Sequence, residues 1–145
     1  MKVDGSFTLA APRQKVWDLL QDPEVLVGCI PGCKSFEASG DDTYEVELRI
    51  GVGPVVGSYK ASVEIGDKRP PDSYRLTVKG GGAMGTARGE ALLSFVEEGD
   101  RTTVEIDAEA HVTGVVARVG QRMMGSASKM IMKQFFDCIT SKIGS

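Results

Sequence analysis

Two cysteines four positions apart, Cys29 and Cys33, are the side chains of this sequence best suited to chemistry. Thiolates bind soft metal ions, and two neighbouring thiols can form a reversible disulfide. A tetrahedral zinc site needs four ligands, yet the single histidine, His111, and the third cysteine, Cys138, both lie far along the chain. The ligand count therefore disfavours a metal site, and we expect none.

A redox role for the cysteine pair is also disfavoured, although it stays open. Dithiol oxidoreductases usually carry Cys-x-x-Cys at a helix start, and this spacing is absent. Between the two cysteines, Pro31 and Gly32 are typical turn residues. We expect Cys29 and Cys33 to be small apolar residues that pack where a helix turns into a strand.

His111 is the natural candidate for acid-base catalysis, but its position in a predicted strand argues against this role. Successive side chains of a strand point to opposite faces, and His111 shares the polar face with Asp107 and Glu109. We therefore expect a solvated histidine. No serine, cysteine or carboxylate can be assigned to it as a triad partner.

Two glycine-rich runs resemble phosphate-binding loops only superficially. Residues 51–57 lead into a predicted strand rather than a helix, and no Gly-Lys-Ser or Gly-Lys-Thr follows them. Residues 80–85 have the composition of a hairpin tip, whose functional interpretation would be a mobile lip at a cavity mouth. No phosphate loop is predicted.

Composition restricts the class of protein. The chain has 145 residues, 41% of them apolar, which is enough for a single domain over residues 1–145 with a real core. Its net charge of −3 disfavours a nucleic-acid-binding protein. No run approaches the ~20 apolar residues that span a membrane, and Asp4 interrupts any signal peptide. With an odd number of cysteines, these features predict a soluble, cytoplasmic protein.

The periodicity of apolar residues predicts the elements that position these side chains. Phe7 and Leu9 begin a short strand, a helix starts near Pro12, and Asp22-Pro23 starts a second short helix. Apolar residues then alternate with polar ones, as in half-buried antiparallel strands separated by turns. The predicted strands cover residues 44–50, 59–65, 74–78, 87–95 and 104–112.

From Gly114 almost to Ser145 the period becomes helical. An antiparallel sheet with one apolar face must bury it, and this long helix is the element able to cover it. The predicted fold is α+β, with a curved antiparallel sheet wrapped around the long C-terminal helix and two short helices after the first strand. The side chains predicted on one broad apolar face of that helix are Val116, Val119, Met123, Met124, Ala127, Met130, Ile131, Phe135 and Cys138.

Four local sequences carry a resemblance to a known family: Asp22-Pro23, Cys29-Ile30-Pro31-Gly32-Cys33, Gly53-Pro54-Val55-Val56-Gly57 and Gln134-Phe135-Phe136. With the order of the elements, they resemble the family of the CoxG subunit of carbon monoxide dehydrogenase over essentially the whole chain. That family belongs to the START-like (SRPBCC) superfamily. The resemblance therefore implies a helix-grip fold with a hydrophobic cavity between the sheet and the long helix.

The resemblance also implies a function. Members of the family are thought to be non-catalytic accessories of a molybdenum-containing CO dehydrogenase, which hold a quinone for electron delivery to the membrane or assist maturation of the enzyme. We therefore expect a protein that binds a hydrophobic small molecule, such as menaquinone, ubiquinone or another lipid, without a covalent cofactor. Its expected partner is a CO dehydrogenase-like molybdenum hydroxylase.

Side chains that face the cavity from the strands and the helix are the candidates for ligand contact. Methionine is unbranched and polarisable, which suits a pocket for a bulky apolar ligand, although a methionine stripe can equally be core packing. Small inward residues such as Ala61 and Ala91 would leave room. The predicted ligand-binding residues are Tyr44, Val46, Leu48, Tyr59, Val63, Leu76, Met84, Phe95, Ile106, Met123, Met124, Ala127 and Met130.

The terminal helix also carries a basic stripe beside a second apolar row. A helix of this kind can lie on the inner face of an anionic membrane or dock into a partner groove. The alternative, which we favour, is that the short helices cover the row and the stripe only solvates the helix. The predicted partner-binding or membrane-binding residues are Arg122, Lys129, Met132, Lys133, Phe136 and Ile139.

Two other functional classes stay open. An assembly or membrane-recruitment factor would act through the apolar row from Met132 to Ile143. A cyclase or hydrolase of the same fold would need polar or acidic side chains around the cavity, and the inward sets of residues contain almost none.

Overall fold

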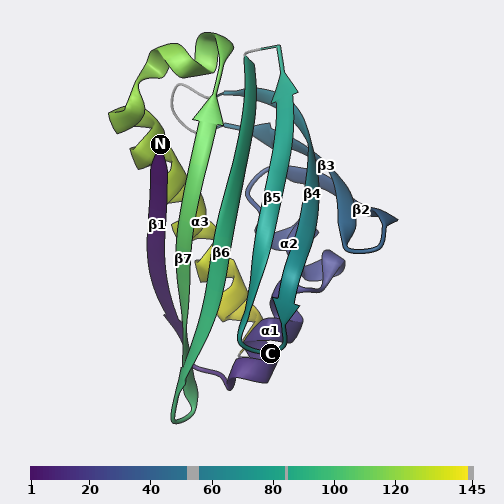
Figure 1. Cartoon of the computed structure of the whole chain (residues 1–145), viewed down its shortest axis with the longest axis vertical. Coiled ribbons are helices and arrows are strands. Elements are labelled where there is room, and N and C mark those ends of the chain that lie inside the picture. Colours follow the sequence, from purple (N-terminus) through teal and green to yellow (C-terminus); the bar gives the residue numbers. More distant parts are fainter. Residues whose placement is uncertain (52–55, 84, 144–145) are drawn as a thin grey trace.

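A single sheet curves around the C-terminal helix in the computed structural model, which describes residues 1–51, 56–83 and 85–143 (Figure 1). The predicted α+β helix-grip architecture is confirmed. The elements come in the order β1 (Lys2–Leu9), α1 (Arg13–Leu20), α2 (Pro23–Cys29), β2 (Cys33–Gly40), β3 (Thr43–Ile50), β4 (Gly57–Arg69), β5 (Ser73–Gly82), β6 (Gly85–Glu98), β7 (Arg101–Val112), η2 (Gly114–Val119) and α3 (Gln121–Ile143).

The described strands form one sheet in the order β1-β7-β6-β5-β4-β3-β2, and every neighbouring pair is antiparallel. Strand β1 is longer than the short strand predicted near Phe7. It pairs with β7 from Lys2 opposite Glu109 to Leu9 opposite Thr102. The length of β1 therefore follows from its pairing with β7, which the alternation of apolar residues in β1 does not reveal. Helix α3 lies behind the sheet, α1 lies toward the lower end of the molecule in Figure 1, and α2 lies above α1 near mid-height.

The two short helices start where the sequence predicts. Pro12 is the N-cap of α1 in an extended conformation, with φ −62° and ψ 154°. Asp22 caps α2, because its carboxylate accepts a hydrogen bond from the Glu24 N–H at 3.0 Å, and Pro23 follows at the first helical position. The Asp22-Pro23 pair therefore separates two helices that would otherwise run together.

The turn after α2 is also confirmed. Gly32 has a φ of +75°, a left-handed conformation that other residues adopt at a cost. Its carbonyl accepts a hydrogen bond from the Arg49 N–H at 2.9 Å, which ties the turn to β3. Chain reversal at Pro31-Gly32 thus places β2 at the edge of the sheet beside β3.

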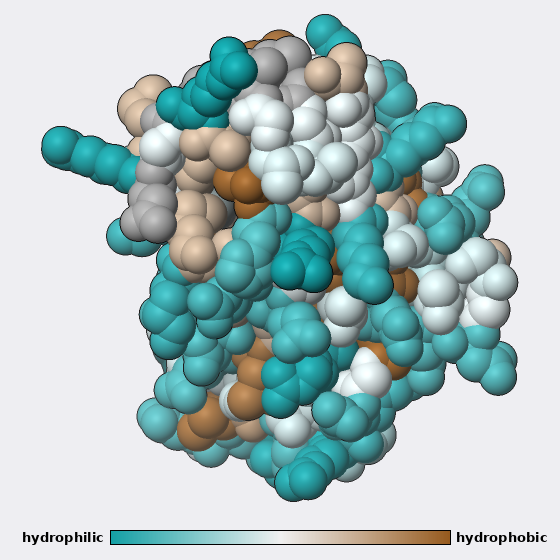
Figure 2. Space-filling model, turned by 45° about the horizontal axis from the view of Figure 1, so that its top comes forward, coloured by the Kyte–Doolittle hydropathy of each residue, from teal (hydrophilic) through white to brown (hydrophobic). Residues whose placement is uncertain are grey.

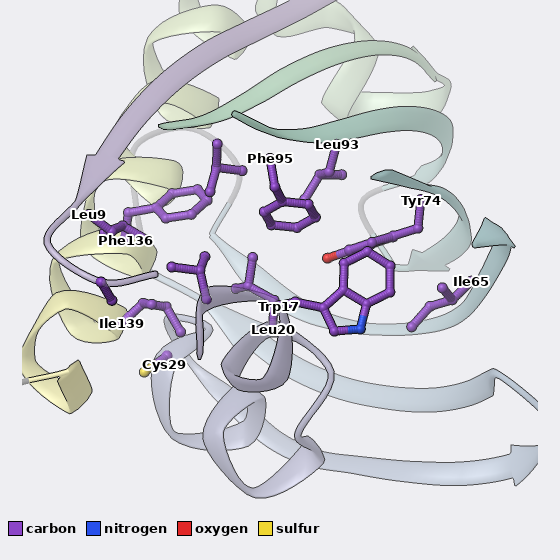
Figure 3. Packing of buried hydrophobic residues seen from close by; sticks show 13 residues of the cluster. Leu9, Trp17, Leu20, Cys29, Ile65, Tyr74, Leu93, Phe95, Phe136 and Ile139 are labelled. Atoms are coloured by element: carbon purple, nitrogen blue, oxygen red, sulfur yellow. The ribbon is translucent and has the colours of Figure 1, made fainter. Parts of the chain in front are cut away.

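The main core lies between the sheet and the helices at the α1 end (Figure 3). Trp17 of α1 makes edge contacts with Tyr74 of β5 and Phe95 of β6, with ring centroids 5.2 and 5.4 Å apart. Phe136 of α3 stacks on Phe7 of β1 at 4.3 Å. Aromatic pairs of this kind join α1 and α3 to the concave face of the sheet.

The predicted continuous helix from Gly114 is wrong in one respect. A 3-10 helix, η2, comes first, and Gly120, with a φ of +89°, separates it from α3. Phe136 and Ile139 of α3 are buried, whereas Met123 and Met130 are 51% and 49% exposed. The buried arc of the helix is therefore shifted from the predicted one: Met124, Ala127, Ile131 and Phe135 of the predicted face do border the space under the sheet, whereas Met123 and Met130 do not.

The cysteines are the second correction. Cys29 forms a disulfide with Cys138, with Cα atoms 5.3 Å apart, whereas Cys33 is a free thiol. Cys29 packs in the core as predicted, but its disulfide to Cys138 was not predicted, and the alternative Cys29–Cys33 pair does not form here. Helix α2 packs against the C-terminal half of α3, which brings together two thiols separated by 109 positions in sequence.

Candidate ligand-binding cavity

Two apolar chambers lie between the sheet and α3. The lower chamber, toward α1 and α2, has a volume of about 360 Å³. Its walls come from β1, β2, β4, β5, β6 and β7, from α1, α2 and the loop after α2, and from α3. The residues that line it are Val3, Leu20, Leu26, Ile30, Pro31, Phe36, Val63, Ile65, Tyr74, Leu76, Val78, Ala91, Leu93, Ile106, Ala108, Ile131, Met132, Phe135 and Phe136.

The upper chamber, toward η2 and the β5–β6 turn, has a volume of about 340 Å³. It is apolar apart from a few groups, among them the hydroxyl of Tyr59 and the basic side chains of Lys60 and Arg88. The residues that line it are Met1, Leu48, Ile50, Tyr59, Lys60, Ala61, Val78, Gly80, Gly81, Ala87, Arg88, Gly89, Ala110, Val112, Met124, Ala127, Ser128 and Ile131.

The two chambers meet at Val78 of β5 and Ile131 of α3, which line both. Inward side chains of β5 follow one another from Tyr74 through Leu76 and Val78 to Gly80. At about 3.3 Å per residue, this row is roughly 20 Å long. Together the chambers form an elongated apolar space along the concave face of the sheet.

The surface above the upper chamber is less polar than the rest of the face in view. Figure 2 shows pale, tan and brown residues gathered at the top of the molecule, while teal residues cover most of the lower part. Met123, in the first turn of α3, and Val56, just before β4, are large hydrophobic side chains exposed to 51% and 46%. An apolar ligand would meet a matching surface at this end.

Polar groups near the chambers are shifted toward their neutral forms. Burial raises the pKa of the Tyr74 hydroxyl well above its usual value, and burial also raises the pKa of Tyr59. Burial raises the pKa of the Cys33 thiol, while its hydrogen bond to the Ser35 carbonyl has the opposite, smaller effect. These groups therefore stay uncharged at neutral pH.

Seven of the predicted ligand-binding residues border the chambers, namely Leu48, Tyr59, Val63, Leu76, Ile106, Met124 and Ala127. Tyr44, Val46 and Phe95 face the same side but pack into the core without lining either chamber. Met84 lies outside the described residues. Met123 and Met130 are on the exposed side of α3, so their predicted place in the cavity is wrong.

Several wall residues were not predicted. Val78 continues the alternation of Leu76, so the pattern could have identified it, whereas Ala91 was predicted as a small inward residue and does line the lower chamber. Leu26 and Ile30 of the α2 region could not have been found in this way, because nothing in their own sequence indicates that α2 closes the cavity. The wall formed by α2 is known only from the packing of that helix against β2 and α3.

For the second apolar row on α3, the favoured interpretation, that the row is covered, agrees with the structure, and its apolar residues are not available as partner or membrane contacts. Met132, Phe136 and Ile139 point toward the sheet, and Phe136 and Ile139 are 4% and 0% exposed, so they do not form an outer row. Arg122, Lys129 and Lys133 are exposed as predicted. Lys133 forms an ion pair with Asp137 one turn later, at 2.7 Å.

His111 is exposed on the outer face of the sheet, where it pairs in register with Arg88 of β6, as the alternation predicts. Within residues 1–51, 56–83 and 85–143, no group of three or more His, Cys, Asp or Glu side chains could hold a metal ion. No helix in this described part is long and apolar enough to cross a membrane.

Comparison with known proteins gives the family. The family description of the CoxG subunit of carbon monoxide dehydrogenase matches residues 5–144. The chain belongs to the CoxG family. A conserved protein from Geobacillus kaustophilus, of known crystal structure, is 36% identical to this CoxG-family chain, with a TM-score of 0.96 over 99% of this chain and 95% of that one.

More distant structures share the fold. A START superfamily protein from Mycobacterium smegmatis has a TM-score of 0.78 at 12% identity, over 99% of this CoxG-family chain and 97% of its own. A protein from Thermus thermophilus has a TM-score of 0.68 at 17% identity, over 98% and 99% of the two chains. No curated protein matches the sequence. The predicted START-like fold is confirmed.

Proposed function

We propose that this protein is a non-catalytic carrier of an apolar small molecule, a quinone or another lipid, and that it serves a CO dehydrogenase-like molybdenum enzyme. The bound quinone would link the enzyme to the quinone pool of the membrane. The observation that carries the proposal is the pair of adjoining apolar chambers between the sheet and α3. The CoxG family supplies the proposed partner.

The chamber volumes support a ligand rather than imperfect core packing. Protein interiors are close-packed, and voids larger than a water molecule are few. The volumes of about 340 and 360 Å³ lie within the usual range for small-molecule pockets, which is roughly 300–1,000 Å³. At about 25 cal/mol per Å² of apolar surface removed from water, filling such walls with an apolar molecule would be strongly favourable.

The chemistry of the walls supports a carrier rather than an enzyme. General acid-base catalysis needs a titratable group beside the reacting atoms. Among the residues that line the lower chamber, the hydroxyl of Tyr74 is the one oxygen or nitrogen group on a side chain, and burial raises its pKa. A cyclase or hydrolase is therefore less well supported than binding.

Native mass spectrometry tests the carrier function directly. The purified protein would be measured as isolated and after addition of decylubiquinone, a quinone with a ten-carbon tail. We expect a complex with one quinone per chain. A protein that keeps its apo mass with decylubiquinone, and that yields no lipid on organic extraction, would contradict the proposal.

The link to the enzyme needs a separate measurement. With CO dehydrogenase present, oxidation of CO and water to CO₂ releases two electrons and two protons, and these reduce a quinone to its quinol. We expect the ultraviolet absorbance of protein-bound decylubiquinone to fall when CO is added, and to fall much more slowly when the carrier is omitted. Equal rates with and without the carrier would contradict this role.

A second function, contact with an anionic membrane surface, is favoured by the exposed side of α3. Met123 and Met130 lie two turns apart on this side, and Arg122 and Lys129 precede them. We expect the protein to co-sediment with vesicles containing phosphatidylserine, and the double variant M123S/M130S to do so less. Because neither methionine lines a chamber, quinone binding should be unchanged in this variant.

A further inference from the structure

Tyr74 combines deep burial with a position in the wall of the lower chamber. Its side chain comes from β5, and only 3% of the residue is exposed. The ring is held from two sides by Trp17 and Phe95, with centroid distances of 5.2 and 5.7 Å. Figure 3 shows its hydroxyl oxygen directed toward the middle of the cluster, between these two rings. The position of the hydroxyl is therefore well defined.

This hydroxyl has no hydrogen-bond partner among the described residues. Two other buried side-chain atoms without a partner, Arg13 Nε and Gln21 Nε2, are completely enclosed by protein atoms. Unlike these two atoms, the unpartnered Tyr74 oxygen is not completely enclosed by protein atoms, so it borders open space. Of the two chambers described above, the lower one is lined by Tyr74, and we therefore assign the open space beside this oxygen to it.

An unsatisfied hydroxyl in such a place needs an explanation. Leaving a buried donor without an acceptor costs about 1–3 kcal/mol, and native proteins contain few such groups. A water molecule is a poor solution, because a buried water needs at least two polar partners and the other side chains of this chamber are apolar. An acceptor on a bound molecule would satisfy the hydroxyl.

The ionisation state of Tyr74 defines the acceptor. Burial raises the pKa of the hydroxyl, so at neutral pH it is an uncharged O–H that can donate one hydrogen bond. No lysine or arginine lines the lower chamber, so a carboxylate ligand would bring an uncompensated charge into an apolar space. A neutral oxygen acceptor accepts the hydrogen bond without bringing a charge into the chamber.

We infer that the Tyr74 hydroxyl donates a hydrogen bond to a carbonyl oxygen of the ligand and so selects apolar ketones, quinones or esters over hydrocarbons and fatty acids. This inference rests on the proposed carrier function and specifies its ligand class. Tyr74 lies at one end of the inward row of β5, about 20 Å from Gly80 at the other. A ligand with its carbonyl at Tyr74 would therefore extend an apolar tail past Val78 toward the upper chamber.

A matched pair of probes tests the inference. 2-Acetylnaphthalene and 2-ethylnaphthalene have nearly the same shape, but only the first carries a carbonyl oxygen. Their dissociation constants would be measured by isothermal titration calorimetry with the wild-type protein and with Tyr74→Phe, which keeps the ring and removes the hydroxyl. We expect the substitution to weaken ketone binding about tenfold and to leave the hydrocarbon unchanged.

A second measurement needs no variant. Infrared spectroscopy of bound 2-acetylnaphthalene reports whether its carbonyl accepts a hydrogen bond, because the stretching frequency falls when it does. We expect a lower frequency in the wild-type complex than in hexane, and the hexane value in the Tyr74→Phe complex. A frequency equal to that in hexane in both complexes would overturn the inference.

The outcomes separate the two levels of the proposal. Failure of both probes to bind a wild-type protein that does bind decylubiquinone would overturn this inference alone, and failure of decylubiquinone as well would overturn the carrier function too. Binding of both probes with no effect of Tyr74→Phe on ketone affinity would overturn only the role of the hydroxyl. A tenfold loss confined to the ketone would support both.

Discussion

Tyr74 couples the stability of the fold to alkaline pH. Burial raises the pKa of its hydroxyl in the folded state, whereas an unfolded tyrosine ionises near the ordinary value of about 10. The unfolded chain therefore loses this proton first. The resulting contribution to stability is complete below about pH 10 and decreases as the pH rises above it, with a slope of up to about 1.4 kcal/mol per pH unit.

The prediction is that the free energy of unfolding falls more steeply above pH 10 in the wild-type protein than in Tyr74→Phe. Urea unfolding from pH 8 to pH 11, followed by circular dichroism, would show this difference. At pH 8 the variant should be at least as stable as the wild type, because it loses no hydrogen bond and removes a buried hydroxyl that the ligand-free protein leaves unsatisfied. Parallel pH profiles for the two proteins would contradict this account of Tyr74.

Gly32 is a second residue with a specific requirement. Its φ of +75° is left-handed, and a Cβ atom at this position would overlap the carbonyl oxygen of Arg49. We expect Gly32→Ala to lower the free energy of unfolding by about 1–3 kcal/mol, through backbone strain and a weakened bond to β3. Gly28→Ala is the control, because a Cβ there meets no atom within 4 Å and alanine favours the α2 helix.

Thermal and urea unfolding of the two alanine variants would decide the matter. A loss of stability in Gly28→Ala equal to that in Gly32→Ala would show that the effect is not specific to the left-handed turn.

Sequence patterns predicted single residues better on strands than on α3. Alternation in a strand assigns each side chain to one of two opposite faces, so Leu48, Leu76 and Ile106 were placed on the concave side correctly. On a helix, apolar residues spread over a broad arc, so the pattern does not fix which part of the arc is buried. For this reason Met123 was placed inside although it is exposed, and Phe136 was offered as a partner contact although it is buried.

Among the elements, α2 and α3 are joined covalently. The Cys29–Cys138 disulfide closes a covalent loop that contains strands β2 to β7, and its two cysteines are 109 positions apart in sequence. A disulfide of this span restricts the unfolded chain, and its removal typically lowers stability by about 2–4 kcal/mol. We expect this loss in the double variant C29A/C138A, measured by urea unfolding against the oxidised wild type.

Cys33→Ala is the matched control for that experiment, because Cys33 is a free, half-buried thiol. It should change the unfolding free energy by much less. If reduction of the wild-type protein with dithiothreitol left its stability unchanged, the contribution assigned to the disulfide would be wrong.

The existence and order of the elements were largely predictable, whereas their long-range contacts were not. The turn residues and the change from period two to a helical period marked the strands from β3 to β7 and α3, whereas β2 was not predicted. The break at Gly120 was not predictable, because a single glycine is tolerated within a helix and the apolar pattern continues across it. The partner of Cys29 depends on where α2 docks on α3, and no local pattern encodes that contact.

At the scale of the whole molecule, the fold follows from one requirement. The sheet has an apolar concave face, and α3, α1 and α2 are the elements that cover it. The chambers are a separate matter, because they depend on how far α3 lies from the sheet. Phe135 and Phe136 of α3 pack against the core, and the space beside them remains open as the lower chamber. The family resemblance predicted the cavity, and the small inward residues Ala61 and Ala91 were consistent with it.

The central claim is that the two chambers hold one elongated apolar molecule. Two substitutions would fill them separately: Ala91→Trp places a large ring in the lower chamber, and Ala127→Trp places one in the upper chamber. Met130→Trp is the control, because Met130 is exposed on the opposite side of α3. Circular dichroism would first establish that all three variants are folded.

Calorimetric titration of these variants with decylubiquinone is the most direct test. We predict one binding site in the wild type, an affinity at least tenfold weaker in Ala91→Trp and in Ala127→Trp, and no change in Met130→Trp. Wild-type affinity in both filled variants would contradict the claim that the ligand lies between the sheet and α3.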